Sequence, residues 1–185
     1  DGVTVEDCFN FVEKVTHTFD IPFLIMTYYN IAFRFGLKDF VRVMLDCGLR
    51  GAIIPDLPPE EGREYLDAMV SAELAPILIF SPTTSTDRMR YICSFARGFV
   101  YCVARKGVTG KNTNFSDDLT AYLNQCRAET SLPLALGFGV KEKADIDFLK
   151  GKADIAVIGT QTIRVIEQKG VAAVGEFIRS LGVIR

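Results

Sequence analysis

Two short glycine turns are the residues of this sequence best suited to hold an anion. Gly137-Phe138-Gly139 follows the apolar segment 132–136, and Gly159-Thr160 follows the apolar segment 153–158. Glycine lets the backbone approach a ligand without a Cβ in the way, and the N–H groups at a helix start carry the positive end of its dipole. Glycine is also common at strand ends simply because it favours turns, without any ligand. Because two such turns end consecutive apolar segments, they predict a phosphate site, to which the Thr160 hydroxyl adds a donor.

A long polar loop over residues 104–114 is the second feature with functional potential. It contains Arg105, Gly107, Thr109 and Gly110. Long loops beside a ligand site commonly close over it as lids, and the two glycines are hinge candidates. Gly110 is expected to add a backbone N–H to the phosphate site. The alternative interpretation is a solvated connection without function.

Three aromatic residues, Tyr28, Tyr101 and Phe138, fall at or near the ends of predicted strands. They either fill the core or line a pocket for a flat apolar ligand that carries a phosphate tail. Asp56, beside Pro58, ends another strand and is a cap, an interface residue or a hydrogen-bond partner for a neighbouring loop. The strand ends offer no pair of carboxylates, so no general acid and base are visible.

The elements that must position these residues alternate between helices and continuously apolar strands. Strands with apolar residues throughout are buried on both faces, which is typical of a parallel sheet covered by helices. Strands are predicted over 22–27, 51–55, 76–80, 98–103, 132–136 and 153–158, and helices over 5–18, 37–47, 60–73, 87–96, 116–130, 141–150 and 171–181, with a short helical stretch after Thr160.

Six strand–helix units fit either an open doubly wound sheet or a (β/α)8 barrel of which about two units are not in this chain. A barrel needs eight units and ~250 residues, and the 185 residues fall short by about two units of roughly 30 residues each. The arithmetic favours an α/β TIM barrel with about six of its eight units, and a single domain over residues 1–185. In barrels the loops after the last two strands often bind phosphate.

Composition excludes several other classes of protein. The net charge of −2 offers no basic surplus for a nucleic-acid backbone, and the longest apolar stretches are far shorter than the ~20 residues that cross a membrane. The five cysteines are odd in number and contain no CxxC, which favours free thiols in a reducing cytoplasm. His17 is the only histidine, so no metal site of several histidines is expected.

Seven segments together resemble the alpha subunit of tryptophan synthase. The order and spacing of these segments agree from end to end, and the Arg-x-Gly-Val-Thr-Gly loop followed by Gly-Phe-Gly is specific to this family among phosphate-binding barrels. The segments are Met26-Thr27-Tyr28-Tyr29-Asn30, Pro55-Asp56-Leu57-Pro58, Ser81-Pro82-Thr83-Thr84, Arg97-Gly98-Phe99-Val100-Tyr101, Arg105-Lys106-Gly107-Val108-Thr109-Gly110, Leu136-Gly137-Phe138-Gly139-Val140 and Val157-Ile158-Gly159-Thr160.

The resemblance implies a lyase that cleaves indole-3-glycerol phosphate to indole and glyceraldehyde 3-phosphate in tryptophan biosynthesis. Indole would pass to a pyridoxal-phosphate-dependent beta subunit in an α2β2 complex, and the alpha subunit would hold no cofactor. Carried over by motif, the residues are Gly110, Gly137, Phe138, Gly139, Gly159 and Thr160 for phosphate, Tyr28, Tyr101 and Phe138 for indole, Arg105, Gly107 and Thr109 for the lid, and Tyr28, Asn30, Asp56 and Pro58 for the side that faces the beta subunit.

The sequence departs from the family in one large respect. The family's two catalytic acids lie in a Glu-Leu-Gly-x-Pro-x-Ser-Asp-Pro-x-Ala-Asp-Gly stretch, and the matching region here begins after it, at Asp1. One carboxylate moves a proton at indole C3 and the other helps withdraw the indole N–H proton, so these 185 residues alone are expected to be inactive. A smaller departure is Thr160, where serine is usual.

Two other interpretations remain at this stage. One is a catalytically incomplete alpha subunit that binds the phosphate ligand and modulates a beta subunit, which the missing acids favour. The other is a different indole- or sugar-phosphate barrel enzyme, against which the loop from Arg105 to Gly110 argues.

Overall fold

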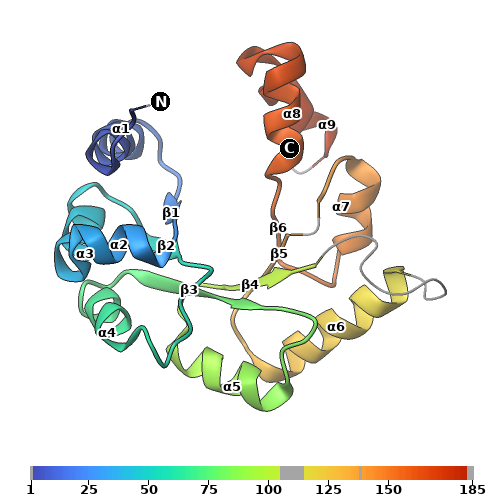
Figure 1. Cartoon of the computed structure of the whole chain (residues 1–185). Coiled ribbons are helices and arrows are strands. Elements are labelled where there is room, and N and C mark those ends of the chain that lie inside the picture. Colours follow the sequence, from blue (N-terminus) through green and yellow to red (C-terminus); the bar gives the residue numbers. More distant parts are fainter. Residues whose placement is uncertain (1, 105–114, 138, 183–185) are drawn as a thin grey trace. The chain divides into compact units, whose positions relative to one another are not determined.

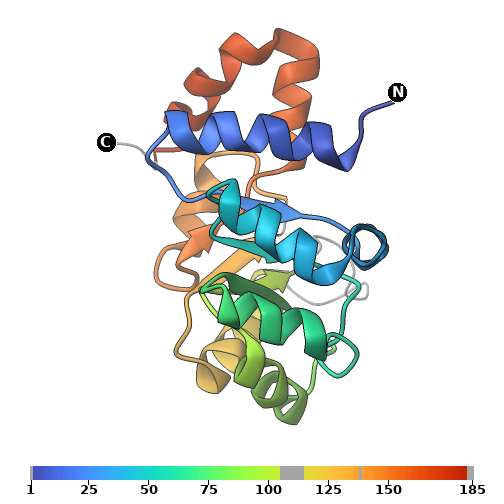
Figure 2. The same cartoon turned by 90° about the vertical axis from the view of Figure 1, so that its left-hand side faces the viewer.

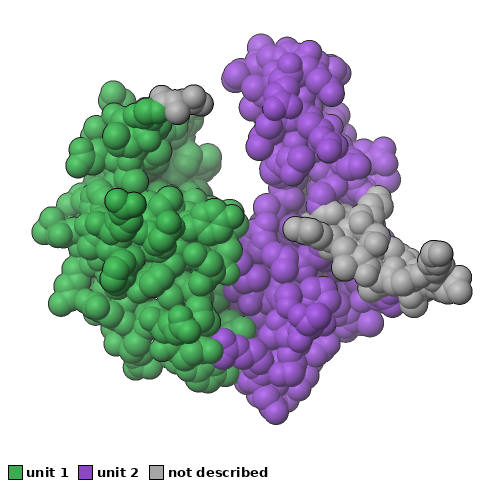
Figure 3. Space-filling view, viewed as in Figure 1, with its two compact units in different colours: residues 1–78, 91–98 green, residues 79–90, 99–185 purple. Residues whose placement is uncertain are grey.

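The computed structural model describes residues 2–104, 115–137 and 139–182 (Figure 1). The chain divides into two compact units, drawn in different colours in Figure 3. Unit 1 comprises residues 1–78 and 91–98, and unit 2 comprises residues 79–90 and 99–185. Strand β3 (Ala75–Phe80) and helix α5 (Thr86–Phe95) contribute residues to both units.

Unit 1 contains three parallel strands with helices packed beside them (Figures 1 and 2). Leu24 of β1 lies opposite Gly51 of β2, which in turn lies opposite Ala75 of β3. The elements are α1 (Val5–Thr18), β1 (Leu24–Met26), α2 (Tyr29–Phe35), α3 (Leu37–Asp46), β2 (Gly51–Ile53) and α4 (Arg63–Ser71), followed by the first part of β3 and the end of α5.

The core of unit 1 joins α1, α2 and α3 through a cluster of phenylalanines. The ring of Phe9 lies 5.7 Å from that of Phe35 and 5.4 Å from that of Phe40, both edge to face. Phe40 and Met44 are completely buried. A capping box begins α1, since the Thr4 hydroxyl accepts from the Asp7 N–H and the Asp7 carboxylate accepts from the Thr4 N–H.

Unit 2 contains a second set of parallel strands. Val100 of β4 lies opposite Leu134 of β5, and Ala135 of β5 lies opposite Ile155 of β6. Leu123 and Leu136 are fully buried side chains of this unit. The elements are β4 (Val100–Val103), α6 (Phe115–Glu129), β5 (Leu134–Gly137), α7 (Lys143–Leu149), β6 (Ile155–Ala156), α8 (Thr160–Lys169), a 3-10 turn (Val171–Ala173) and α9 (Val174–Ser180).

The parallel strand–helix repeat is as predicted, and the differences are local. Helix α2 was not predicted, because its aromatic-rich sequence has no capping side chain of its own and Asp56 supplies one from 27 residues away. Strand β6 pairs over two residues where six were expected. The last helix begins with a 3-10 turn after Gly170, whose φ of +80° suits glycine. Within the described ranges, no helix is both long and apolar enough to span a membrane.

Candidate functional site

The ends of three strands lie side by side in unit 2 and bring the predicted phosphate turns together. Val103 of β4 is opposite Gly137 of β5, and the Ala104 N–H donates to the Gly137 carbonyl at 3.0 Å. On the other side of β5, the Val157 N–H donates to the Leu136 carbonyl at 2.9 Å. The turn that begins at Gly137 is therefore a neighbour of the turn that leads from β6 to α8.

The Cβ positions of Gly139 and Gly159 are open among the described residues. None of the described residues places a heavy atom within 4 Å of where a Cβ would stand at either glycine. Gly139 has a φ of +87°, a conformation that favours glycine. Gly159 directly precedes the ten-residue helix α8, whose first residue is Thr160. The first N–H groups of such a helix lack partners within the helix and bind anions readily.

Gly137 has a different reason to be glycine. A Cβ on Gly137 would lie 2.9 Å from Cζ of Tyr101, 3.2 Å from its Cε1 and closer still to its hydroxyl. Tyr101 lies on β4 opposite Ala135, and its half-buried side chain leans along the sheet to Gly137. Burial raises the pKa of the Tyr101 phenol, so the ring stays neutral at physiological pH. A predicted phosphate turn and a predicted indole-pocket residue are thus in direct contact.

Five of the predicted residues lie outside the described ranges. Phe138, which was expected in both the phosphate site and the indole pocket, is one of them, and Gly110 is another. The same holds for the predicted lid residues Arg105, Gly107 and Thr109.

In unit 1, the turns after β1 and β2 are joined by the Asp56 side chain. The Thr27 N–H donates to the Ile53 carbonyl at 3.1 Å, and the Tyr29 N–H donates to Asp56 Oδ1 at 2.9 Å. Asp56 thus acts as the hydrogen-bond partner of a neighbouring loop, which was one of its three possible roles, and it caps α2. Tyr28 is 63% exposed.

Asn30 and Asp56 are also exposed, and Pro58 is half-buried. The four residues predicted to face a beta subunit are therefore at least partly accessible in unit 1.

One positioning residue escaped the sequence analysis. The Asp154 carboxylate accepts from the Leu134 N–H at 2.7 Å and pairs with the Arg127 guanidinium, and it so ties the start of β5 to α6. The Leu134 hydrogen bond, and after it the Arg127 contact, hold the Asp154 pKa below its ordinary value. An aspartate at the head of the apolar run 153–158 was the available signal.

Comparison with solved structures defines the class of fold. The chain superposes on a tryptophan synthase alpha subunit from Campylobacter jejuni with a TM-score of 0.86 and 26% sequence identity, and the match covers 97% of this chain and 72% of that one. A tryptophan synthase structure from Mycobacterium tuberculosis gives a TM-score of 0.87 at 27% identity. The fold is therefore of the (β/α)8-barrel class, as predicted.

Sequence comparison narrows the class to one family. Residues 1–179 match the family model described as tryptophan synthase alpha chain, and the chain belongs to that family. A tryptophan synthase alpha chain from Desulforapulum autotrophicum is 60% identical over 180 residues, and one from Syntrophotalea carbinolica is 58% identical. Each match covers 97% of this chain and 71% of the relative. The resemblance found in the sequence motifs is confirmed.

Proposed function

We propose that this chain carries the substrate-binding part of a tryptophan synthase alpha subunit, the lyase that cleaves indole-3-glycerol phosphate to indole and glyceraldehyde 3-phosphate. Membership of the family supports the reaction. The observation that carries the proposal is the pair of adjacent turns in unit 2, where the backbone of Gly139 and Gly159 is open beside the start of α8. A terminal phosphate bound there would receive N–H donors and the Thr160 hydroxyl.

The proposal assigns the other residues by motif. Gly110, Gly137 and Phe138 would complete the phosphate site, Tyr28, Tyr101 and Phe138 would line the indole pocket, and Arg105, Gly107 and Thr109 would belong to a lid. The proton transfers belong to the family's glutamate and aspartate, whose motif these 185 residues do not contain. In this proposal, the residues that bind the substrate and the residues that transfer protons lie in different segments of the family's sequence.

Binding of an unreactive analogue tests the phosphate site without requiring catalysis. Indole-3-propanol phosphate has the indole ring and the phosphate but lacks the hydroxyl groups needed for cleavage. We expect saturable binding by isothermal titration calorimetry, and at least about tenfold weaker binding for Gly159→Asp, because a carboxylate would stand where the phosphate binds.

Gly151→Asp controls for the added charge, and far-UV circular dichroism checks its folding because Gly151 has a φ of +75° that favours glycine. Gly151 is exposed, the described residues leave its Cβ position equally open, and it precedes β6 instead of following it. Equal affinity of the two aspartate variants would contradict the proposed phosphate site.

We further propose a beta subunit as partner. The M. tuberculosis neighbour is a tryptophan synthase structure. In this chain Tyr28, Asn30, Asp56 and Pro58 would face the beta subunit in an α2β2 assembly, and pyridoxal phosphate would belong to the beta subunit, so the alpha chain would hold no cofactor. Tyr28→Asp should weaken association with a relative's beta subunit in sedimentation velocity. Val171→Asp, at a residue 73% exposed, should not.

Two broader expectations complete the proposal. Units 1 and 2 would be parts of one barrel domain over residues 1–185. The five cysteines are free thiols, which supports a reducing compartment such as the cytoplasm.

A further inference from the structure

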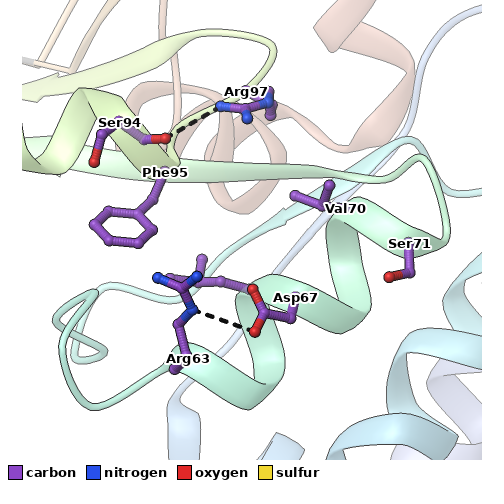
Figure 4. A pocket seen from close by; sticks show the side chains of 8 residues that line it. Arg63, Asp67, Val70, Ser71, Ser94, Phe95 and Arg97 are labelled. Atoms are coloured by element: carbon purple, nitrogen blue, oxygen red, sulfur yellow. Dashed lines mark hydrogen bonds and ion pairs between the residues drawn. The ribbon is translucent and has the colours of Figure 1, made fainter.

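A cavity of about 530 Å³ lies within unit 1 between α4 and the end of α5 (Figure 4). Volumes of this size are typical of sites for small organic molecules. Leu66 and Val70 of α4 and Phe95 of α5 give it an apolar wall. Leu66 is buried, whereas Val70 is 47% exposed, so the wall is partly open to solvent. None of these residues belongs to the proposed phosphate, indole or partner site.

A stacked arginine forms one side of the cavity. The Arg63 guanidinium carbon lies 5.5 Å from the centre of the Phe95 ring, and Arg63 Nε donates to Asp67 Oδ2 at 3.2 Å. The Phe95 ring is itself held edge to face by Tyr91 at 5.1 Å. Among the described contacts, Arg63 donates to Asp67 through Nε, so the Nη atoms of its guanidinium remain for a ligand.

A second arginine reaches the cavity from the turn between α5 and β4. The Arg97 backbone N–H donates to the Pro76 carbonyl at 3.1 Å and so anchors the turn to β3. Arg97 Nη1 donates to the carbonyls of Ala96 at 2.8 Å and Ser94 at 3.5 Å. These two contacts with carbonyls at the C-terminal end of α5 occupy Nη1. The other donors of this oriented guanidinium remain for a ligand, as far as the described contacts go.

The charges and the wall together define the ligand. Arg63 and Arg97 against Asp67 leave one net positive charge beside an apolar surface, which suits a monoanion better than the near-dianion of a phosphate ester. A guanidinium matches a carboxylate with two parallel hydrogen bonds. We propose that the cavity between α4 and α5 binds a small carboxylate with a flat apolar body, its carboxylate on Arg97 and Arg63 and its body on Val70 and Phe95.

The test uses 2-naphthoate with the full chain and ligand-observed NMR. For a probe of this size the expected Kd is on the order of 1 mM. Arg97→Gln and Arg63→Gln should each weaken binding by about tenfold, since each removes a charge-assisted hydrogen bond. The control is Arg42→Gln, which removes an equally exposed arginine paired with Asp39 on α3 and should change Kd by less than about twofold. Arg63 and Arg97 are exposed, so neither replacement should unfold the chain. Far-UV circular dichroism checks that both variants are folded.

Chemical analogues of the probe separate the possible sources of binding. The uncharged 2-naphthamide should bind about tenfold more weakly than 2-naphthoate. Equal binding of the amide, equal weakening by Arg42→Gln, or tighter binding of 2-naphthyl phosphate would each overturn the carboxylate assignment. Displacement of 2-naphthoate by indole-3-propanol phosphate would also overturn it, because the probe would then occupy the proposed substrate site.

Discussion

Replacing Gly137 by alanine perturbs the contact between the turn after β5 and Tyr101. The new methyl carbon would lie 2.9 Å from Cζ of Tyr101 and closer still to the hydroxyl, well inside van der Waals contact. The ring cannot stay where it is, so it must rotate on β4 or the turn after β5 must shift. Overpacking of this kind typically costs 1–3 kcal/mol, and we expect about 2 kcal/mol of unfolding free energy. For a chain of this size that corresponds to roughly 4–8 °C in Tm.

A double-mutant cycle isolates the clash with the ring. In a Tyr101→Val background the side chain is too short to reach Gly137, so Gly137→Ala should cost less than about 0.5 kcal/mol there by urea unfolding. Gly159→Ala is the control, because the described residues leave its Cβ position open and its φ of −105° suits alanine. The same cost of Gly137→Ala in both backgrounds, or an equal cost for Gly159→Ala, would refute the reasoning.

Three further predictions concern the two units. Asp154 has a lowered pKa in the folded state, so its contribution to the free energy of unfolding is present above its unfolded pKa of about 3.9 and is lost as the pH falls through the lower folded value. Asp154→Asn should therefore make the free energy of unfolding fall less steeply at acid pH. An unchanged dependence on acid pH would count against this role. Asp56→Ala should cost about 1 kcal/mol in urea unfolding because α2 loses the acceptor of the Tyr29 N–H, whereas Asp56→Asn should keep most of it; equal losses would contradict the cap. A thiol reagent should label exposed Cys8 at once and buried Cys102 only on unfolding, since its contact with the Cys126 thiol and its burial raise the Cys102 pKa; fast labelling of Cys102 in the folded chain would contradict its burial.

Patterns that depend on neighbouring residues were predictable from the sequence. The capping box of α1 needs only Thr4 and Asp7, three residues apart, and Gly48 after α3 adopts the left-handed φ of +74° that is common for a glycine just past a helix end. Continuously apolar strands likewise indicated a parallel sheet, because burial on both faces leaves no alternation.

Contacts between residues far apart in the sequence were not predictable. Helix α2 depends on Asp56, and β5 depends on Asp154, 20 residues beyond Leu134. The glycines of the predicted phosphate turns look alike in the sequence. Only their surroundings separate Gly137, which accommodates Tyr101, from Gly139 and Gly159, whose Cβ positions meet none of the described residues.

Indole release from indole-3-glycerol phosphate tests the central claim most directly. The 185-residue chain should bind indole-3-propanol phosphate but release no indole, because it contains the proposed binding turns and not the stretch with the two carboxylates. The same chain joined to the preceding residues of the 60% identical D. autotrophicum relative should release indole, and Gly159→Asp should suppress that release. Indole release by the 185 residues alone, or none by the extended chain, would contradict the account.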